Sequence, residues 1–297
     1  CHTLPMGTDH RLTTRQMAQF VADGFIRFDA IVPADVNERA IDEMRRLEAE
    51  RLAPDGLKPP HTGTPLDDCY PPPSAIGEYL RLAQVRGIIE SFVGENPTFD
   101  HDWTHHIRPH ATDVQPLHVD AITDTDDPTF DIQLFWYPHD VEPGEGGTRF
   151  VPGSHLHRVR SSCLDRYQHI VGERQFSGPA GTVVVFHHGL WHAGQPNSGN
   201  GHRWMHKVRL NPSAAQVRLW NTDDLDALQN PPSDHIFARV MPDSVAQILR
   251  TMHPWMSITD HRNEQLQRAR LWRYLTGDTT YDVDHYLTRL ESRAALL

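Results

Sequence analysis

Two residues near the middle of the chain, His118 and Asp120, have the spacing needed to bind one metal ion together. They lie in the stretch PLHVD at 116–120. In a strand, side chains two positions apart face the same side, so this imidazole and this carboxylate converge. A second histidine from a distant strand would complete the set of two histidines and one carboxylate that binds non-haem Fe(II). For the tripeptide taken alone, a hydrogen-bonded pair in a polar strand is the simpler interpretation.

His192 is the candidate for the second histidine. It lies 74 residues after His118, at the end of a buried-type strand and before a turn rich in Gly, Pro and Asn. Antiparallel strands between the two positions would bring them together. His187 and His188 lie on the same strand and compete with His192, although local packing or hydrogen bonding explains them equally well. The chain has 21 histidines, so most of them must be structural or solvated.

The elements that would position these residues follow a helix–sheet–helix order. Residues 130–137 alternate apolar and polar side chains with a period of two, and 181–186 and 203–210 are further strands. Expected helices lie between Thr13 or Thr14 and Gly24, over 34–52, between Ser74 and Gly94, and over roughly 243–253, 262–276 and 282–296. This order predicts an α+β fold, an antiparallel sheet or barrel covered by helices.

Three polar side chains on the expected strands are candidates to contact a substrate. His105 belongs to an alternating run, 101–107, and Gln133 and Tyr137 share the polar face of the 130–137 strand. Each is equally compatible with a packed or solvated position.

Four sequence blocks, in order, carry a resemblance to the phytanoyl-CoA dioxygenase (PhyH-like) family of Fe(II)/2-oxoglutarate oxygenases. The resemblance covers roughly residues 13–212. The blocks are Asp23-Gly24-Phe25 with the helix before it, Pro116–Asp120, the segment from Trp136 through Glu145-Gly146-Gly147 to Pro152-Gly153-Ser154-His155, and His192–Asn197 with Arg203. The resemblance implies a double-stranded β-helix, a jelly roll of two facing sheets. Residues 213–297 would then be a helical extension packed on this core, in a single domain overall.

The resemblance also implies residue roles. His118, Asp120 and His192 would bind Fe(II), and Arg203 would pair with the distal carboxylate of 2-oxoglutarate. Arg209 has the same strand parity as Arg203, and only the spacing from His192 favours Arg203. A family tryptophan near the cofactor corresponds to Trp136, which could equally be a core residue. The sequence departs from the family pattern in two places. Gly194 stands where the family often has Ser or Thr, and Gly146-Gly147 replaces Asn-Gly.

The implied activity is Fe(II)-, O₂- and 2-oxoglutarate-dependent hydroxylation of a small molecule, with release of succinate and CO₂. Asp120 favours hydroxylation, or another oxidation, over halogenation, because related halogenases replace this carboxylate with a small residue. Desaturation and epoxidation stay open, and the substrate is not identified. Two alternatives remain: a cupin-like metal-dependent dioxygenase that does not use 2-oxoglutarate, and a catalytically inactive ligand-binding barrel.

Composition limits the partners. The chain of 297 residues has a formal net charge of −11, which argues against binding to nucleic acid or an anionic membrane. No apolar run approaches the roughly 20 residues of a transmembrane helix. Three widely spaced cysteines and the lack of a visible signal peptide favour a cytoplasmic location, although the chain starts at Cys1 rather than Met. The C-terminal helices are a candidate lid or homodimer surface.

Overall fold

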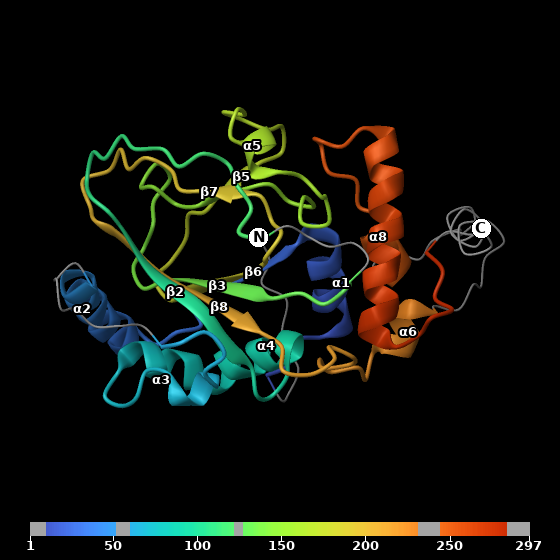
Figure 1. Cartoon of the computed structure of the whole chain (residues 1–297), viewed down its shortest axis with the longest axis horizontal. Helices are drawn as coiled ribbons and strands as arrows, with labels where there is room; N and C mark the ends of the chain where they lie inside the picture. The colour runs from blue at the N-terminus through green and yellow to red at the C-terminus, as the bar shows by residue number, and fades with distance from the viewer. Residues whose placement is uncertain (1–9, 52–59, 122–126, 231–243, 284–297) are drawn as a thin grey trace.

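The computed structural model describes residues 10–51, 60–121, 127–230 and 244–283. Helices cover one face of a large sheet, and a smaller sheet lies on the other side (Figure 1). The helices are α1 (Thr14–Asp23), α2 (Ala34–Arg51), the 3₁₀ turn η1 (Leu66–Asp68), α3 (Ala75–Arg81), α4 (Ala83–Val93), α5 (Ser161–Leu164), α6 (Leu225–Gln229), α7 (Val245–Leu249) and α8 (Ile258–Thr276).

Two antiparallel sheets form the core of the fold. The large sheet has the order β1-β6-β3-β8-β2 and the small sheet the order β5-β4-β7. The strands are β1 (Phe25–Phe28), β2 (Thr98–Ile107), β3 (Ile132–Tyr137), β4 (Arg149–Phe150), β5 (Arg174–Gln175), β6 (Thr182–His187), β7 (His192–Ala193) and β8 (Arg203–Asn211). Phenylalanines from both sheets pack together between them. The predicted α+β class with a double-stranded β-helix core is confirmed.

The period-two pattern of β3 separates the two faces of the large sheet. Leu134 and Trp136 join a large apolar cluster with the helices, whereas Phe135 and Tyr137 pack in the cluster between the sheets. The same alternation on β8 places Val208 on the helical side. The inner face therefore receives every second residue of these strands, which is what the sequence pattern predicted.

The first helix and strand form as expected from local signals. Thr13 and Gln16 make a reciprocal capping box at the start of α1, and Gly24 ends the helix with a φ of 77°. The chain then enters β1, which pairs with β6 through Phe25 and Phe186. A left-handed residue at position 24 is thus what turns the helix into the edge of the large sheet.

The helix expected between Ser74 and Gly94 is two helices. Ser74 caps α3, as predicted, but Leu82 has an extended ψ of 133° and separates α3 from α4. Both helices pack in the shared apolar cluster on the outer face of the large sheet.

The described part of the C-terminal region joins the same core. Leu271 and Trp272 of α8 are buried with Phe20 of α1 in one apolar cluster. The predicted helices over 243–253 and 262–276 correspond to α7 and α8. Most of the expected helix over 282–296 lies outside the described residues. Among the described residues, no helix is long and apolar enough to cross a bilayer.

Candidate metal centre and cosubstrate cavity

The structure brings the three predicted metal ligands together. His118 and His192 are partners in an isolated antiparallel bridge, with both backbone N···O distances at 3.0 Å. Asp120 Oδ1 lies 3.7 Å from His118 Nε2, and Asp120 Oδ2 lies 3.5 Å from His192 Nε2. The potential ligand atoms are all within 4.8 Å of one another, and no second cluster of this kind occurs in the described part of the chain.

Both imidazoles are held in the tautomer that metal binding requires. His118 Nδ1 lies 2.9 Å from the carbonyl oxygen of Pro116, and His192 Nδ1 lies 2.9 Å from that of Leu190. A carbonyl oxygen can only accept, so each Nδ1 must donate its proton. Each Nε2 then keeps its lone pair as an acceptor, and both Nε2 atoms lie beside the Asp120 carboxylate. Such outer hydrogen bonds are the usual way in which proteins orient histidine ligands.

Charges around the cluster keep the carboxylate ionised. Burial opposes the charged form of Asp120, but His192, Lys207 and His118 outweigh it and hold the pKa of Asp120 well below its usual range. Burial lowers the pKa of His192 to about 4. An ionised carboxylate and a neutral buried imidazole are the protonation states that bind Fe(II).

Arg203 lies in the same cavity, whose volume is about 80 Å³. Its side chain is buried, with 2% of the residue exposed. The guanidinium Nε donates to the carbonyl of Gly146 at 2.9 Å, but Nη1 has no hydrogen-bond partner among the described residues. A buried donor without a partner is costly, so this group is suited to an incoming carboxylate.

The competing arginine is already paired. Arg209 forms an ion pair with Asp131, with Nε···Oδ2 at 3.1 Å, and it does not line the cavity. Of the two arginines with the same strand parity, Arg203 is thus the one with free hydrogen-bonding capacity beside the cluster.

The glycines at 146 and 147 are explained by packing. Gly146 has a φ of 75° and supplies the carbonyl that holds Arg203. A Cβ on Gly147 would overlap the backbone carbonyl of Phe176. Position 147 therefore requires the glycine that the family also has, and position 146 has the left-handed conformation that Gly and Asn both favour.

At the second departure, Gln115 fills the space beside Gly194. Its Oε1 accepts a hydrogen bond from Gly194 N at 3.0 Å, and its Nε2 lies 3.5 Å from His118 Nε2. Gln115 lines the cavity, and a Cβ at position 194 would come within 3.3 Å of its side-chain oxygen. Sequence reasoning missed Gln115, because its position in a loop carries no periodic signal.

Lys207 is the second missed residue. Its Nζ lies 2.6 Å from Asp120 Oδ2, and it lines the cavity from the inner face of β8. Two signals in the sequence could have identified it. Lys207 shares the strand parity of Arg203, and only two of the chain's 28 cationic residues are lysines.

Of the three predicted substrate contacts, one lines the cavity. His105 does so, and burial lowers its pKa to about 3. Tyr137 stacks on Phe176 between the sheets and donates to Thr148 Oγ1 at 2.8 Å. Gln133 is fully buried on the same strand and has no partner for its amide among the described residues. Neither Tyr137 nor Gln133 lines the cavity.

The predicted contact between Trp136 and the cofactor is wrong. Its indole stacks on Tyr79 at a centroid distance of 4.2 Å, and Nε1 donates to Asn37 Oδ1 at 3.0 Å. These partners belong to α3 and α2 on the outer face of the sheet. Because adjacent residues of a strand point to opposite faces, Trp136 cannot share the inner face with Phe135.

The alternative histidines have other roles. His187 packs against Phe130, with ring centroids 5.0 Å apart, and its Nδ1 accepts from the backbone of Gly189. His188 Nδ1 accepts from the backbone of Asp131 at 2.9 Å. In His187 and in His188, Nδ1 is therefore occupied as an acceptor. Neither residue belongs to the metal-ligating cluster.

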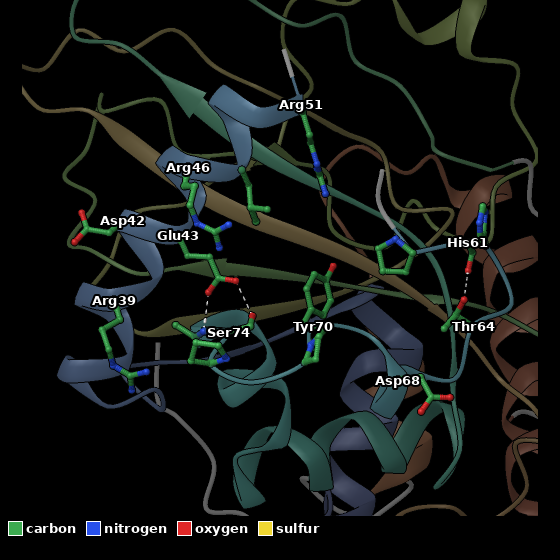
Figure 2. Close-up of a pocket in the computed structure, with 15 residues that line it drawn as sticks. Arg39, Asp42, Glu43, Arg46, Arg51, His61, Thr64, Asp68, Tyr70 and Ser74 are labelled. Carbon is green, nitrogen blue, oxygen red and sulfur yellow. Dashed lines mark hydrogen bonds between the residues drawn. The ribbon is translucent and has the colours of Figure 1, made fainter. Parts of the chain in front are cut away.

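A larger cavity, of about 750 Å³, lies between α2 and the segment before α3 (Figure 2). Its polar groups are largely used in structural contacts. Glu43 accepts from Ser74 Oγ and from the backbone of Ala75, both at 2.6 Å, at the start of α3. Arg51 pairs with Asp102 at 2.7 Å. Volume alone would favour this cavity, but the candidate metal ligands line the smaller one.

Comparison with known proteins agrees with this site. The phytanoyl-CoA dioxygenase (PhyH) family model matches residues 20–205. No curated protein matches the sequence.

Solved structures share the fold at low sequence identity. AviO1 from Streptomyces viridochromogenes Tue57 is 17% identical, with a TM-score of 0.53 over 71% of this chain and 98% of its own. EctD from S. alaskensis with bound Fe is 16% identical, with a TM-score of 0.54 over 71% and 80%. SnoK, described as a non-heme alpha ketoglutarate dependent carbocyclase, is 16% identical, with a TM-score of 0.50 over 71% and 88%. Because the family model covers more than half of its length, this chain belongs to the phytanoyl-CoA dioxygenase family of Fe(II)/2-oxoglutarate-type oxygenases.

Proposed function

We propose that the protein uses Fe(II), O₂ and 2-oxoglutarate to hydroxylate a small molecule, with release of succinate and CO₂. The observation that carries this proposal is that an unpartnered arginine donor lies in the same cavity as the cluster of His118, Asp120 and His192. A facial set of two histidines and one carboxylate leaves the remaining coordination positions open for ligands. A cation that is free beside such a set suits a dicarboxylate cosubstrate.

The protein's own residues orient and isolate the reacting groups. The carbonyls of Pro116 and Leu190 fix the two imidazoles, and Gly146 fixes the Arg203 guanidinium. Phe135 and Met205 line the cavity with apolar surface, which limits water around it. Bound iron would supply the redox chemistry that activates O₂ at the expense of 2-oxoglutarate.

Two alternative functions differ from the proposed one in what they require. A dioxygenase that does not use 2-oxoglutarate would have no need of a buried cation with an unused donor. An inactive ligand-binding barrel would consume no cosubstrate and release no succinate. SnoK shows that this fold also hosts carbocyclisation, so the reaction type needs its own test. Incorporation of ¹⁸O from ¹⁸O₂ into the product supports hydroxylation, and an oxidised product without the label contradicts it.

Anaerobic titration with Fe(II) and 2-oxoglutarate tests the assignment of the cosubstrate. The wild-type protein should develop the visible charge-transfer band of an Fe(II)–keto acid complex. Arg203→Met should weaken 2-oxoglutarate binding by about tenfold to a hundredfold, because charged hydrogen bonds are lost, and should leave iron binding intact.

Arg209→Met is the matched control, because Arg209 lies on the same face of the same strand but is already paired with Asp131. It should leave the 2-oxoglutarate titration unchanged. A wild-type protein that binds iron but never forms the band would refute the use of 2-oxoglutarate. If Arg209→Met were the damaging variant, the distal carboxylate would be held at the other end of the strand.

A further inference from the structure

Lys207 is an incompletely satisfied cation beside the metal ligands. The residue is 7% exposed, and its Nζ lies 2.6 Å from Asp120 Oδ2. That oxygen is its one hydrogen-bond acceptor among the described residues, and the ring of Phe135 lies 5.9 Å from the ammonium. An ammonium group has three donors. Two donors are thus available in a cavity that lies next to the iron ligands.

The net charge of the cavity shows that these two donors lack an anionic partner. The charged residues that line the cavity are Asp120, Arg203 and Lys207, which together carry one net positive charge. Fe(II) and the 2-oxoglutarate dianion cancel each other, so that charge persists in the loaded site. Under the proposed function Arg203 is matched by the distal carboxylate of the cosubstrate. Asp120 is the one counter-ion of Lys207, and it would also be a ligand of the metal. The remaining positive charge is therefore shared by Lys207 and the metal centre, where burial without a further anion is costly.

We propose that the substrate carries one anionic group, such as a carboxylate, which Lys207 binds beside the iron; this rests on the proposed function. The position of Lys207 adds a geometric consequence. Because Nζ already contacts a metal ligand, an anion bound to it lies close to the iron. The oxidised C–H bond is therefore only a few bonds away from the anionic group.

The arrangement of β8 separates this anion from the cosubstrate. Arg203, Lys207 and Arg209 share the inner face of β8. Along the strand, Arg203 is about 13 Å and Arg209 about 7 Å from Lys207. Arg203 is at one end and Arg209, already neutralised by Asp131, is at the other. The cross-strand partner of Lys207 is Trp103, on the same face as His105 and 59% exposed.

Binding of matched acids and amides tests the proposal. The protein is loaded anaerobically with Fe(II) and 2-oxoglutarate, and a panel of small carboxylic acids is titrated beside their primary amides. Perturbation of the charge-transfer band reports binding at the iron. Some acids should bind more tightly than their amides, and Lys207→Met should reduce this preference by about tenfold or more. Lys207→Arg, which keeps the charge, should retain part of the preference, and Arg209→Met should retain all of it.

Lysine side-chain NMR gives a second readout that does not depend on activity. With selectively ¹⁵N-labelled lysine, the protein has only two such residues, Lys58 and Lys207. In protein loaded with Zn(II) and N-oxalylglycine, the tightest acid of the panel should shift the Lys207 signal, and its amide should not. Lys207→Arg removes and thereby assigns that signal.

The outcomes separate the two proposals. Absence of the charge-transfer band in the wild-type protein refutes the proposed function. A normal band with no acid bound more tightly than its amide, or an acid preference that survives Lys207→Met, refutes only the anion site. If Lys207→Met weakens 2-oxoglutarate itself while acids and amides bind alike, Lys207 binds the carboxylate of the cosubstrate, and the proposal about the substrate is overturned.

Discussion

The metal cluster depends on two backbone carbonyls as well as on its three ligands. Pro116 O and Leu190 O each accept the Nδ1 proton of a histidine two residues away. Since the hydrogen bond and the ligand belong to the same short segment, each imidazole is oriented before any metal arrives. This local design explains how histidines from distant strands can present Nε2 to one point.

Replacement of one ligand should abolish tight iron binding. His192→Ala removes one of only three protein ligands, so Fe(II) affinity should fall by more than about a hundredfold, a larger loss than outer contacts typically cause. Isothermal titration under anaerobic conditions measures this. His188→Ala is the control, because His188 is adjacent to the site in sequence but contacts the backbone of Asp131. Equal affinities for the wild type and His192→Ala would contradict the cluster.

Trp136 should contribute to stability and not to binding of the cosubstrate. Trp136→Phe loses the hydrogen bond to Asn37 and changes the stack on Tyr79, at a cost of about 1–2 kcal/mol in the free energy of unfolding. Chemical denaturation measures this loss, and the charge-transfer titration should give an unchanged 2-oxoglutarate affinity. A weakened cosubstrate affinity with full stability would restore Trp136 to the site.

The period of two along the strands predicts much of the site. A period of two predicted that His118 and Asp120 converge, and they do, although the expected strand is only an isolated bridge at His118 followed by a bend at Asp120. The same period of two placed Trp136 on the apolar face of its strand. Its assignment to the cofactor came from the family resemblance and disagreed with that local pattern. Arg203 was preferred to Arg209 only on its spacing from His192. The ion pair that occupies Arg209 could not be predicted, because Asp131 lies 78 residues away in the chain.

At the scale of elements, the turn between α1 and β1 connects the helical layer to the sheet. Gly24 adopts a left-handed conformation, and a Cβ there would overlap the ring of His155. By contrast, no Gly or Pro at Leu82 predicts the break between α3 and α4. Both helices pack in one apolar cluster, and such long-range contacts are not contained in a local sequence pattern.

Gly24 and Gly63 both have a positive φ, and alanine substitutions at the two positions distinguish the cost of backbone strain from the cost of atomic overlap. Gly24 has a φ of 77° and Gly63 a φ of 90°, but a Cβ on Gly63 would meet nothing within 4 Å. Gly63→Ala should therefore cost about 1 kcal/mol from backbone strain alone. Gly24→Ala should cost clearly more, because His155 must also move. Thermal unfolding of both variants measures the difference, and equal losses would show that His155 moves freely.

At the scale of the whole molecule, buried histidines should make the fold sensitive to acid. Burial lowers the pKa of His155 to about 3 and that of His188 to about 4, and it holds the pKa of His187 well below its usual range. These rings stay neutral in the folded protein, whereas an unfolded chain protonates them near pH 6.5. Stability is thus fully present above pH 6.5 and is lost as pH falls toward 4.

The free energy of unfolding should fall by ~1.4 kcal/mol per pH unit for each such histidine below pH 6.5. Denaturant titrations between pH 7 and 5 measure this slope. His187→Phe should reduce the slope by one proton. A stability that is constant over this range would mean that the three rings are protonated in the folded state.

Other whole-molecule features remain predictions. Self-association through the C-terminal helices was expected from their apolar residues, but in the described region Leu271 and Trp272 pack inward on the core. These side chains are therefore used within the chain, so a homodimer would need other residues. The cytoplasmic location rests on composition alone.

Diffraction at the iron absorption edge, from crystals grown anaerobically with Fe(II) and 2-oxoglutarate, tests the central claim most directly. The account predicts a single anomalous peak about 2.1 Å from Nε2 of His118, Nε2 of His192 and a carboxylate oxygen of Asp120, with the keto acid extending from it to Arg203. Iron bound elsewhere, or a keto acid that does not reach Arg203, would contradict the account.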